Sequence, residues 1–384
     1  MPNIRKVILL LETSRAHVRG LVHGIARYSR LHGPWIFCTD TSFYTKRGAL
    51  SWLRNWGADG MIAPDASEYK EIIRMGLPTI VYRVARNRLP HLPVIIADNE
   101  KVGEMAAEHL LDRGFCHFAY CGPRDRPWGR ERRKSFSKRI TEAGFKLHVF
   151  QMNSHLDSWR SFEREQNSLM EWLKLLPKPV GLMAGNDVCG SYVVEACRIA
   201  GLQVPDRVAV IGVDNDELIC DLTDPPMSSI ALNTEQAGYQ AANLLDKLMA
   251  GEKMMGQNIL VRATHIVTRQ STDILAMEDR TVAEAIRFIR QHDKEAVQVD
   301  DVVDQVAMSR RNLELRFRKA INRSIYSEIK RIRTQQIIRL LCETDLSISE
   351  IALKLGHPSD KHIARYFKQQ TGMSLKEYRK QCGK

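Results

Sequence analysis

A basic segment in the last quarter of the chain has residue types that bind phosphate groups. Between residues 305 and 341, ten Lys or Arg residues stand against two acids, Glu314 and Glu328, a net excess of eight positive charges. The ten are Arg310, Arg311, Arg316, Arg318, Lys319, Arg323, Lys330, Arg331, Arg333 and Arg339. An excess this dense is what binding to a nucleic-acid backbone requires, although a solvated helix face is the ordinary alternative. The formal net charge of the whole chain, +12, also favours an acidic partner.

The same segment carries a helix-turn-helix pattern. A short helix is expected to end at the small residue Ala307, and Ser309 is placed to cap the next helix, over 310–320. In that second helix Leu313 and Phe317 are four residues apart and form one buried stripe. We expect the residues outside the stripe to face solvent or DNA: Arg310, Arg311, Glu314 and Arg318.

The pattern recurs some fifty residues later. Ser349 is placed to cap a helix, Gly356 allows a tight turn, Ser359 caps again, and Ile363 and Phe367 form the next buried stripe. The outward face then holds Asp360, Lys361, Arg365 and Lys368. A joining helix over 326–342, about 25 Å long, would hold two reading helices roughly one DNA turn (~34 Å) apart. Two such units at this spacing are a specific signal for DNA binding.

Motifs typical of enzymes are absent from the sequence. It contains no nucleophile elbow, H-E-x-x-H zinc motif, phosphate-cradling loop or dinucleotide-binding glycine pattern. His109 lies in a helical pattern and is expected to be structural. We therefore predict no enzymatic activity, metal or cofactor. Eight cysteines occur without C-x-x-C pairs; Cys116 and Cys121 are expected as small core residues, and this usage fits a reducing cytoplasm.

The elements that must position these groups divide the chain. Residues 1–268 alternate short apolar runs with helical patterns, which predicts an α/β fold of two doubly wound lobes. The expected strands are Ile4–Leu11, Trp35–Thr39, Gly60–Ala63, Thr79–Tyr82, Val94–Ala97, His117–Cys121, Val180–Ala184, Val208–Val213, Ser229–Leu232 and Ile259–Val267. The expected helices are 17–31, 47–56, 67–75, 100–113, 129–143, 159–175, 187–200 and 234–250.

A polar segment, 269–279, reads as a linker to a separate all-α domain over 280–384. The expected helices there are 280–291, 300–307, 310–320, 326–342, 348–355, 360–370 and 374–380. Ligands of two-lobed α/β folds bind beyond the carboxyl ends of the strands, between the lobes.

The all-α domain carries a set of residues at fixed spacing: Ile351-Ala352, Gly356, Ser359, Phe367-Lys368, Gly372 and Tyr378-Arg379, together with Met308-Ser309, Leu313 and Phe317 of the first motif. In these residues the domain resembles the AraC family of transcription regulators. The sequence departs from the family pattern at four packing positions, Val303, Ala307, His357 and Leu375. The resemblance implies that base-reading side chains come from Arg310, Arg311 and Glu314 and, in the second helix, from Asp360, Lys361 and Arg365. Arg318, Lys319 and Lys368 are expected to contact phosphates; a solvated side chain is the alternative for each residue.

Three segments of the first 268 residues form a second recognisable set: Asp98-Asn99 with Gly103 and His109-Leu110, Gly185-Asn186-Asp187, and Ile211-Gly212-Val213-Asp214-Asn215. In these segments the chain resembles the type I periplasmic-binding-protein fold that serves as the sensor of LacI-type repressors. We expect no N-terminal DNA-binding headpiece, since the first strand begins at Ile4. A sensor of this kind fused to an AraC-type domain resembles the regulators of xylose operons, over nearly the whole chain.

The resemblance implies a sugar site, and two strand ends supply candidates for it. Sugar sites use carboxylates, amides, a forked Arg and aromatic walls. Asp214 follows the strand Val208–Val213 and is the first candidate; a turn or capping role is its alternative. Asn186 and Asp187 follow the strand that ends at Ala184, and we expect Asn186 to bind sugar while Asp187 caps the next helix.

Four further candidates are less direct. Arg132 holds the position of the ligand-binding Arg in the R-x-x-G-F pattern of such sensors, although Ser135 replaces the Gly and neighbouring basic residues compete for the assignment. Trp128 could stack on a sugar or lie in the core. Asp98 could bind ligand or cap helix 100–113, and Arg19 is the weakest candidate.

The expected mechanism follows from the resemblance. A pentose such as D-xylose closes the cleft of a homodimer and changes how paired DNA-binding units sit on operator DNA, and RNA polymerase is an implied partner. A transport-type sugar-binding protein or a regulator of another sugar is the alternative; the basic helical domain and the absence of a signal-peptide layout oppose the first. No apolar stretch approaches the ~20 residues of a membrane span.

Overall fold

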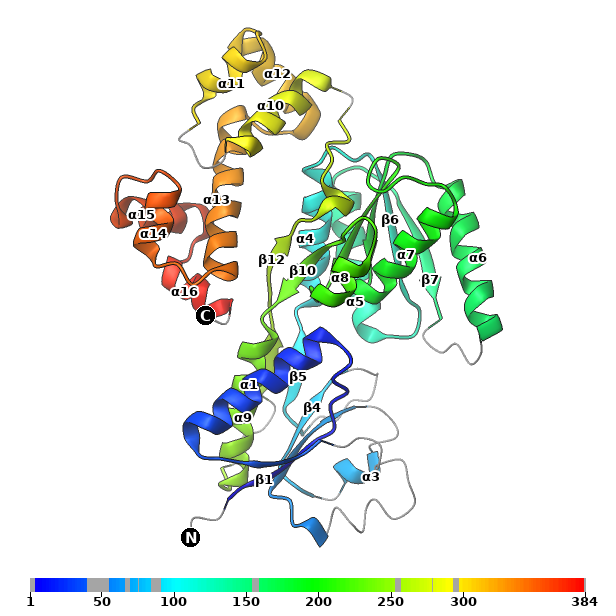
Figure 1. The fold of residues 1–384 in the computed structure, drawn as a ribbon, viewed down its shortest axis with the longest axis vertical. Helices are drawn as coiled ribbons and strands as arrows, with labels where there is room; N and C mark the ends of the chain where they lie inside the picture. Colours follow the sequence, from blue (N-terminus) through cyan, green and yellow to red (C-terminus); the bar gives the residue numbers. More distant parts are fainter. Residues whose placement is uncertain are drawn as a thin grey trace.

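The computed structural model describes residues 4–39, 55–65, 70–74, 76–83, 91–153, 159–252, 257–277, 279–292 and 297–382. Two α/β lobes lie end to end, and a helical part lies beside the second lobe (Figure 1). This arrangement confirms the predicted fold class. Residues 47–54 of the predicted helix over 47–56, and parts of the predicted helix over 67–75, lie outside the described residues. Within the described ranges no helix is long and apolar enough to cross a bilayer.

Lobe 1 is built on a parallel sheet with the strand order β11-β5-β4-β3-β1-β2. Its strands are β1 (Lys6–Leu9), β2 (Ile36–Cys38), β3 (Gly60–Pro64), β4 (Thr79–Tyr82), β5 (Val94–Ala97) and β11 (Asn258–Val261). Its helices are α1 (Ala16–His32), α3 (Lys70–Ile73) and α9 (Thr234–Met249). Helices α1 and α9 pack so closely that a Cβ on Gly24 would lie 1.9 Å from the carbonyl oxygen of Glu235. Glycine is therefore required at that crossing.

Lobe 2 has the strand order β12-β10-β9-β8-β6-β7, with only β12 antiparallel to its neighbour. Its strands are β6 (His117–Pro123), β7 (Leu147–Met152), β8 (Val180–Ala184), β9 (Val208–Val213), β10 (Ser228–Leu232) and β12 (Ala263–Val267). Its helices are α4 (Asn99–Leu111), α5 (Pro127–Glu142), α6 (Trp159–Leu175), α7 (Asp187–Ile199) and α8 (Glu217–Leu222). Neither β7 nor α8 was among the elements expected from the sequence. Strand β7 is an edge strand that is largely exposed, so it lacks the apolar run of a buried strand.

Three chain crossings join the lobes and make the hinge: from β5 to α4, from β10 to α9, and from β11 to β12. The single strand expected over Ile259–Val267 was wrong, because its two halves belong to different sheets. Between them, the Arg262 backbone nitrogen donates to Asn233 Oδ1 at 2.6 Å, which ties two of the crossings together. A continuous β pattern in sequence carries no sign of such a change of sheet.

The helical part contains α10 (Arg280–Gln291), α11 (Val299–Gln305), α12 (Arg310–Ile321), α13 (Ile325–Glu343), α14 (Ile348–Lys354), α15 (Asp360–Thr371) and α16 (Leu375–Gln381). These helices agree with the predicted ones to within two residues at each end, and two apolar cores share α13. Ser347, not Ser349, caps α14, in a reciprocal bond with Glu350. In each helix-turn-helix unit, the turn before the second helix contains a residue with a positive φ. This residue is Ala307, at φ +47°, in the first unit and Gly356, at φ +66°, in the second.

The segment expected as a linker begins inside lobe 2. Ser271 and Thr272 are buried in a short 3₁₀ turn, and Ser271 Oγ donates to the Val210 carbonyl oxygen at 2.6 Å. Buried His109 lies 2.8 Å from Thr272 Oγ1 through its Nε2, so the structural role expected for His109 is confirmed. The residues 270–272 are therefore packed against the sheet, and not extended in solvent.

The cysteines follow the prediction only in part. Cys121 is buried, as expected, whereas Cys116 is exposed. Cys342 and Cys382 form a disulfide that joins the end of α13 to the residue after α16, a pairing that the cysteine spacing did not predict.

Candidate ligand cleft and DNA interface

A cavity of about 850 Å³ lies between the two lobes, at the carboxyl ends of the strands. This volume is within the range of small-molecule sites. Its aromatic walls come from both lobes: Tyr82 from lobe 1, and Trp128, Phe162 and Tyr192 from lobe 2. Charged and amide side chains converge on the same space, including His17, Asn99, Glu131, Arg132, Asn186 and Asp214. Four of the six candidates from the sequence, Asp214, Asn186, Arg132 and Trp128, therefore line one cavity.

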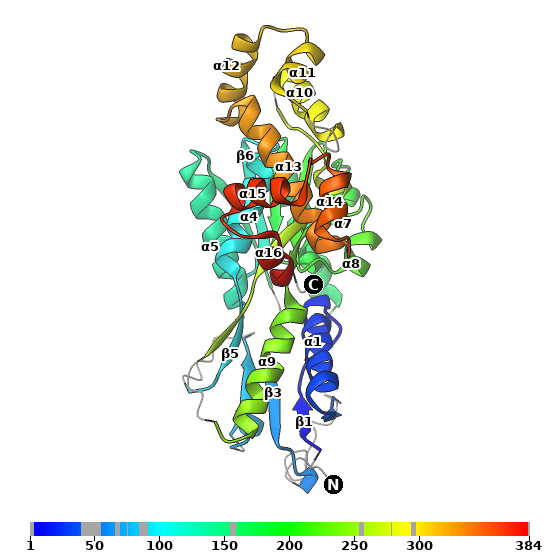
Figure 2. The same cartoon turned by 90° about the vertical axis from the view of Figure 1, so that its left-hand side faces the viewer.

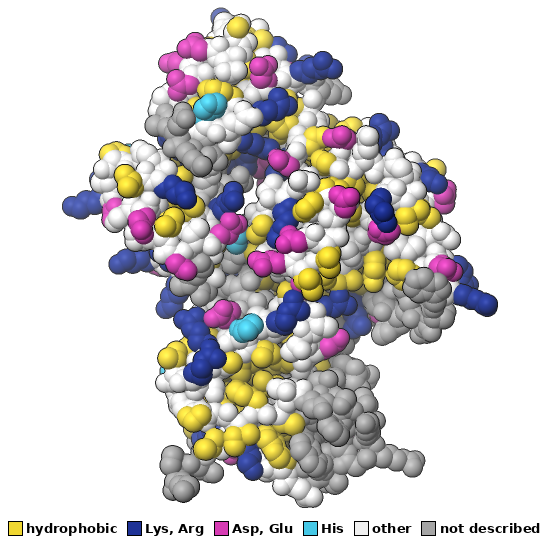
Figure 3. All heavy atoms as spheres, in the orientation of Figure 1, with side chains coloured by type: hydrophobic (Ala, Val, Ile, Leu, Met, Phe, Trp, Pro, Cys, Tyr) yellow, Lys and Arg dark blue, Asp and Glu magenta, His cyan; other side chains and the backbone are white. Residues whose placement is uncertain are grey.

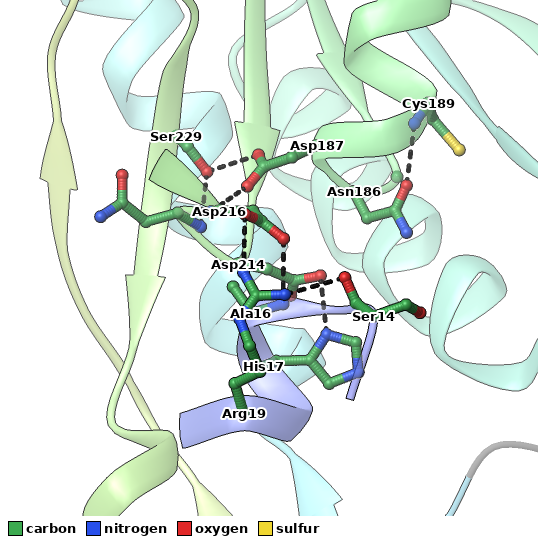
Figure 4. A network of polar contacts seen from close by, with 12 residues as sticks. Ser14, Ala16, His17, Arg19, Asn186, Asp187, Cys189, Asp214, Asp216 and Ser229 are labelled. Carbon is green, nitrogen blue, oxygen red and sulfur yellow. Dashed lines mark hydrogen bonds and ion pairs between the residues drawn. The ribbon is translucent and has the colours of Figure 1, made fainter. Parts of the chain in front are cut away.

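Asp214 contacts polar groups from both lobes across the cleft, and its contact with His17 is drawn in Figure 4. It follows β9 with φ +105°, a conformation that non-glycine residues rarely adopt and that points to a positional requirement. Its Oδ2 is 3.2 Å from His17 Nδ1 of lobe 1, and its Oδ1 is 3.6 Å from Arg132 Nη2 of lobe 2. Burial would raise the pKa of Asp214, but these two partners outweigh burial and lower it. The carboxylate is thus ionised and available as a hydrogen-bond acceptor.

Arg132 is buried and held in one orientation. Its Nε donates to Asn99 Oδ1 at 3.0 Å, and its Nη1 donates to the Gly185 carbonyl oxygen at 2.7 Å. The guanidinium also lies 5.0 Å from the ring centre of Trp128, a cation–π distance. The competing basic neighbours Arg133 and Lys134 do not line the cavity. The Arg132 fork is therefore preorganised, with Nη2 directed to Asp214.

Asn186 takes the capping role expected for Asp187 and lines the cavity as well, whereas Asp187 does neither. Asn186 caps α7 by accepting from the Cys189 backbone nitrogen at 2.9 Å. Asp187 lies behind the cavity wall, where it accepts from Ser229 Oγ at 2.6 Å and from the Asp216 backbone nitrogen at 2.7 Å. Burial, reinforced by the charge of Asp214, raises the pKa of Asp187 to about 8. Asp187 therefore supports the site without facing it.

The other two sequence candidates lie outside the cavity lining. Asp98 takes its alternative role and caps α4, accepting from the Lys101 backbone nitrogen at 3.0 Å. Arg19 donates to Asp216 Oδ1 at 3.0 Å, and the Ala16 backbone nitrogen donates to Asp216 Oδ2 at 2.9 Å (Figure 4). The start of α1 in lobe 1 is thus fastened to lobe 2 by Asp216.

Several polar lining residues were not among the candidates from the sequence, including His17, Asn99 and Glu131. Asn99 connects two of the others, because its Oδ1 accepts from Arg132 and its Nδ2 donates to Glu131 Oε2 at 2.7 Å. Asn99 follows Asp98 directly, so the strand end at Ala97 was a usable signal. His17 and Glu131 lie within helices, where the sequence does not show which side chains face the cleft.

The second helix of each helix-turn-helix unit presents polar side chains to solvent. In α12, Arg311, Arg318 and Lys319 are exposed, and Arg310 lies 3.3 Å from Asp300 of the preceding helix. Glu314 accepts a long bond, 3.4 Å, from the Ile325 backbone nitrogen, so its carboxylate is turned toward the start of α13.

In α15, Lys361, Arg365 and Lys368 are exposed. Asp360 is exposed too and accepts a hydrogen bond from Ser349 Oγ, which links α15 to α14. Lys and Arg side chains project along the outer edge of the region that holds α14 and α15 (Figure 3).

Comparisons with known proteins agree with both halves of the chain. Residues 107–272 match the periplasmic binding protein-like domain, and residues 302–381 match a helix-turn-helix domain. The chain is 32% identical to the xylose operon regulatory protein of Haemophilus influenzae over 388 residues, covering 98% of each chain. It is 31% identical to that of Escherichia coli strain K12, over 97% of this chain and 96% of the other.

The chain belongs to the family of xylose operon regulatory proteins. A solved structure of a xylose-binding transcription activator aligns with 99% of this chain and 98% of its own, with 30% identity and a TM-score of 0.63. Membership in the xylose operon regulatory family confirms the prediction of a transcription regulator and not an enzyme. It also confirms the predicted combination of sensor fold and helix-turn-helix domain.

In this member of the xylose operon regulatory family, the basic segment over 305–341 offers less charge to DNA than its composition suggests. Among the described residues, at least five of its ten basic side chains lie within 4 Å of carboxylates: Arg310, Arg316, Arg323, Arg331 and Arg339. Arg323 and Arg331 pair with Asp112 of lobe 2, so they face the sensor. The count of basic residues alone therefore overstates how much of this cluster can face a nucleic acid.

Proposed function

We propose that a pentose, D-xylose, binds between the two lobes and controls how this regulator binds operator DNA. The observation that carries the proposal is the Arg132–Asp214 pair, which meets Trp128 inside an interlobe cavity. A buried acceptor, a forked donor and an aromatic wall are the components that sugar sites use. The names of the relatives, xylose operon regulatory proteins, support this choice of sugar.

Each lining residue has a chemical role in this proposal. The Asp214 carboxylate accepts hydrogen bonds from two sugar hydroxyls, and Arg132 donates to a hydroxyl or to the ring oxygen through Nη2. Asn186 has its carbonyl oxygen occupied by the α7 cap, which leaves its amide group as a donor. His17 comes from the opposite lobe, so a sugar bound at Asp214 would contact both lobes and favour closure.

DNA recognition is assigned to the second helix of each unit. Arg310, Arg311 and Glu314 of α12, and Asp360, Lys361 and Arg365 of α15, are proposed to reach base edges. Arg318, Lys319 and Lys368 lie further along the two helices and are proposed to contact phosphates. We accordingly divide the chain into a sensor over 1–268, a connecting segment over 269–279 whose residues 270–272 pack on lobe 2, and a DNA-binding domain over 280–384.

The remaining parts of the proposal concern partners. A homodimer would place two DNA-binding domains on paired operator half-sites, and contact with RNA polymerase would account for activation of genes for pentose use. A protein that reads chromosomal DNA acts where the chromosome is, so we assign it to the cytoplasm. These assignments rest on the family and on the DNA-binding role.

Isothermal titration with a panel of pentoses and hexoses tests the sugar proposal. The full chain should release heat with D-xylose and little with hexoses, and Asp214→Ala should abolish the D-xylose signal. Glu104→Gln, a change on the exposed face of α4, serves as the control and should bind as the wild type does. Absence of heat with every sugar, or unchanged binding by Asp214→Ala, would contradict the proposal.

A further inference from the structure

The helix that joins the two DNA-binding units, α13, is fastened to lobe 2 near both of its ends. Its 19 residues extend about 28 Å at the usual rise of an α-helix. Figures 1 and 2 show it beside α4 and β12 of lobe 2. Since α13 lies between the two recognition helices, whatever holds it also sets where those helices point.

The first attachment, here called the α4 clamp, consists of Asp112, Arg323, Glu328 and Arg331. Asp112, the residue after α4, is buried and accepts from Arg323 and, at 2.7 Å, from Arg331 Nη1. Glu328 is fully buried and accepts from Arg331 Nε at 2.9 Å and Nη2 at 2.5 Å. Buried pairs of this kind are costly to break, because removal of one partner leaves the other unpaired. The clamp therefore holds α13 to α4 in a defined geometry.

The second attachment, here called the β12 clamp, consists of Thr264, His265, Glu343 and Tyr378. Tyr378 Oη donates to the Thr264 carbonyl oxygen at 2.9 Å. His265 Nε2 is 3.4 Å from Glu343 Oε1 at the end of α13. Burial alone would raise the pKa of Glu343, but the neighbouring His265 and Arg339 side chains together outweigh burial and lower it. Glu343 is thus held as a carboxylate against β12.

Each clamp is connected to the hinge by one element of lobe 2: the α4 clamp by helix α4, and the β12 clamp by strand β12. Helix α4 begins at the first crossing, where the Asp98 backbone nitrogen donates to the Val261 carbonyl oxygen at 2.9 Å. Its first residue, Asn99, accepts from Arg132 in the cavity. Its Gly103 packs so tightly on α5 that a Cβ there would lie 2.6 Å from the carbonyl oxygen of Arg132. Displacement of Arg132 would therefore displace α4.

Strand β12 has the same relation to the third crossing. It begins at Ala263, directly after Arg262, whose backbone is bonded to Asn233 of the second crossing. Thr264 and His265 are the next two residues, so the β12 clamp lies within three residues of the hinge. A change in the hinge thus reaches the far end of α13 by a separate route.

We propose that the two clamps on α13 couple sugar binding to DNA binding. Sugar contact with Arg132 and closure of the hinge shift α4 and β12, and α13 follows because both of its ends are attached. The two recognition helices then move as one unit relative to lobe 1. This inference rests on the proposed function. It needs only a different affinity of the two hinge states for DNA.

The test compares DNA affinity with and without sugar. A duplex that the full-length wild type selects from a random-sequence pool serves as the probe. Its Kd is measured by fluorescence anisotropy without sugar and with saturating D-xylose. The ratio of the two Kd values should be about 5- to 150-fold in the wild type, the range of ordinary coupling. Asp112→Asn and Tyr378→Phe, which weaken one clamp each, should both bring the ratio to within about twofold of one.

Two measurements keep this test decisive. Calorimetric D-xylose affinity and the thermal midpoint report whether each variant is folded and binds sugar; Arg323→Gln replaces Asp112→Asn if the latter fails to fold. Glu104→Gln on α4, which touches neither clamp, should keep the wild-type ratio. If Arg323→Gln and Tyr378→Phe both keep the wild-type ratio of Kd values, the clamps do not couple the two sites, and the proposed sugar site is unaffected. A wild type that binds no pentose would overturn the proposed function, and the clamps with it.

Discussion

Replacement of Arg132 by Lys keeps the charge in the cleft but removes the fork, so it tests the geometry of the proposed site. In the structure Nε, Nη1 and Nη2 point to three different groups: Asn99, the Gly185 carbonyl oxygen and Asp214. A Lys ammonium is a single point and cannot satisfy all three directions. We therefore expect the variant to fold with a lower thermal midpoint and to orient the sugar poorly.

The size of the effect follows from the bonds that are lost. A hydrogen bond to a charged group contributes about 1.5–3 kcal/mol, and about 1.4 kcal/mol corresponds to tenfold in Kd. Loss of one donor to the sugar should therefore weaken D-xylose binding about 10- to 150-fold. Titration calorimetry measures this change directly, and a thermal melt reports the fold.

Arg133→Lys is the matched control, since Arg133 is the next residue on α5 and does not line the cavity. It should leave the Kd for D-xylose unchanged. If Arg132→Lys binds D-xylose as tightly as the wild type, Arg132 does not orient the ligand and the proposed geometry is wrong. If Arg133→Lys has the larger effect, the assignment of the cavity arginine is wrong.

Two further predictions concern DNA reading and pH. Arg311→Ala should weaken binding to the selected duplex about 5- to 150-fold more than binding to random DNA. Arg318→Ala should weaken binding to the two DNAs equally. If Arg311→Ala also weakens binding to both DNAs equally, Arg311 contacts phosphates and not bases. Burial raises the pKa of Asp187 to about 8, so the folded chain keeps a proton that the unfolded chain releases near pH 4. Stability should therefore fall as pH rises between these values, by at most about 1.4 kcal/mol per unit, and Asp187→Asn should flatten the slope in urea unfolding. Equal slopes for the two chains would show that Asp187 is ionised in the fold.

The regular elements were predictable because their apolar spacing is local. The helices of the helical part follow the 3.6-residue period, and each second helix has one clear stripe, Leu313 with Phe317 or Ile363 with Phe367. Strands β4, β5, β8 and β9 are buried apolar runs, which a sequence shows directly. The edge strand β7 and the change of sheet at Arg262 depend on tertiary position, and no local pattern marks them.

The candidate site was predictable where a residue stands at a strand end. Asp214 and Asn186 follow β9 and β8, and the ends of parallel strands meet at one edge. Asp98 and Arg19 were placed correctly along the chain, but the sequence does not give the direction of a side chain at a helix start. Asp98 turns to its own helix and Arg19 to Asp216.

The clamps on α13 lay beyond sequence reasoning for another reason. Asp112 pairs with residues more than two hundred positions away, and Thr264 with Tyr378, more than one hundred away. Arg323 and Arg331 were counted in the basic cluster because the sequence shows their charge. It does not show that both pair with Asp112. Only the docking of the helical part on lobe 2 shows that these charges bind the sensor.

Regulation of DNA binding by D-xylose is tested by fluorescence anisotropy of the selected duplex with the full chain as D-xylose is added, run in parallel on the wild type and on Asp214→Ala. We expect a sugar-dependent shift in DNA affinity for the wild type and none for Asp214→Ala, with both chains binding DNA equally in the absence of sugar. A shift of the same size in both chains would place the effector site elsewhere. No shift in the wild type would contradict regulation by D-xylose.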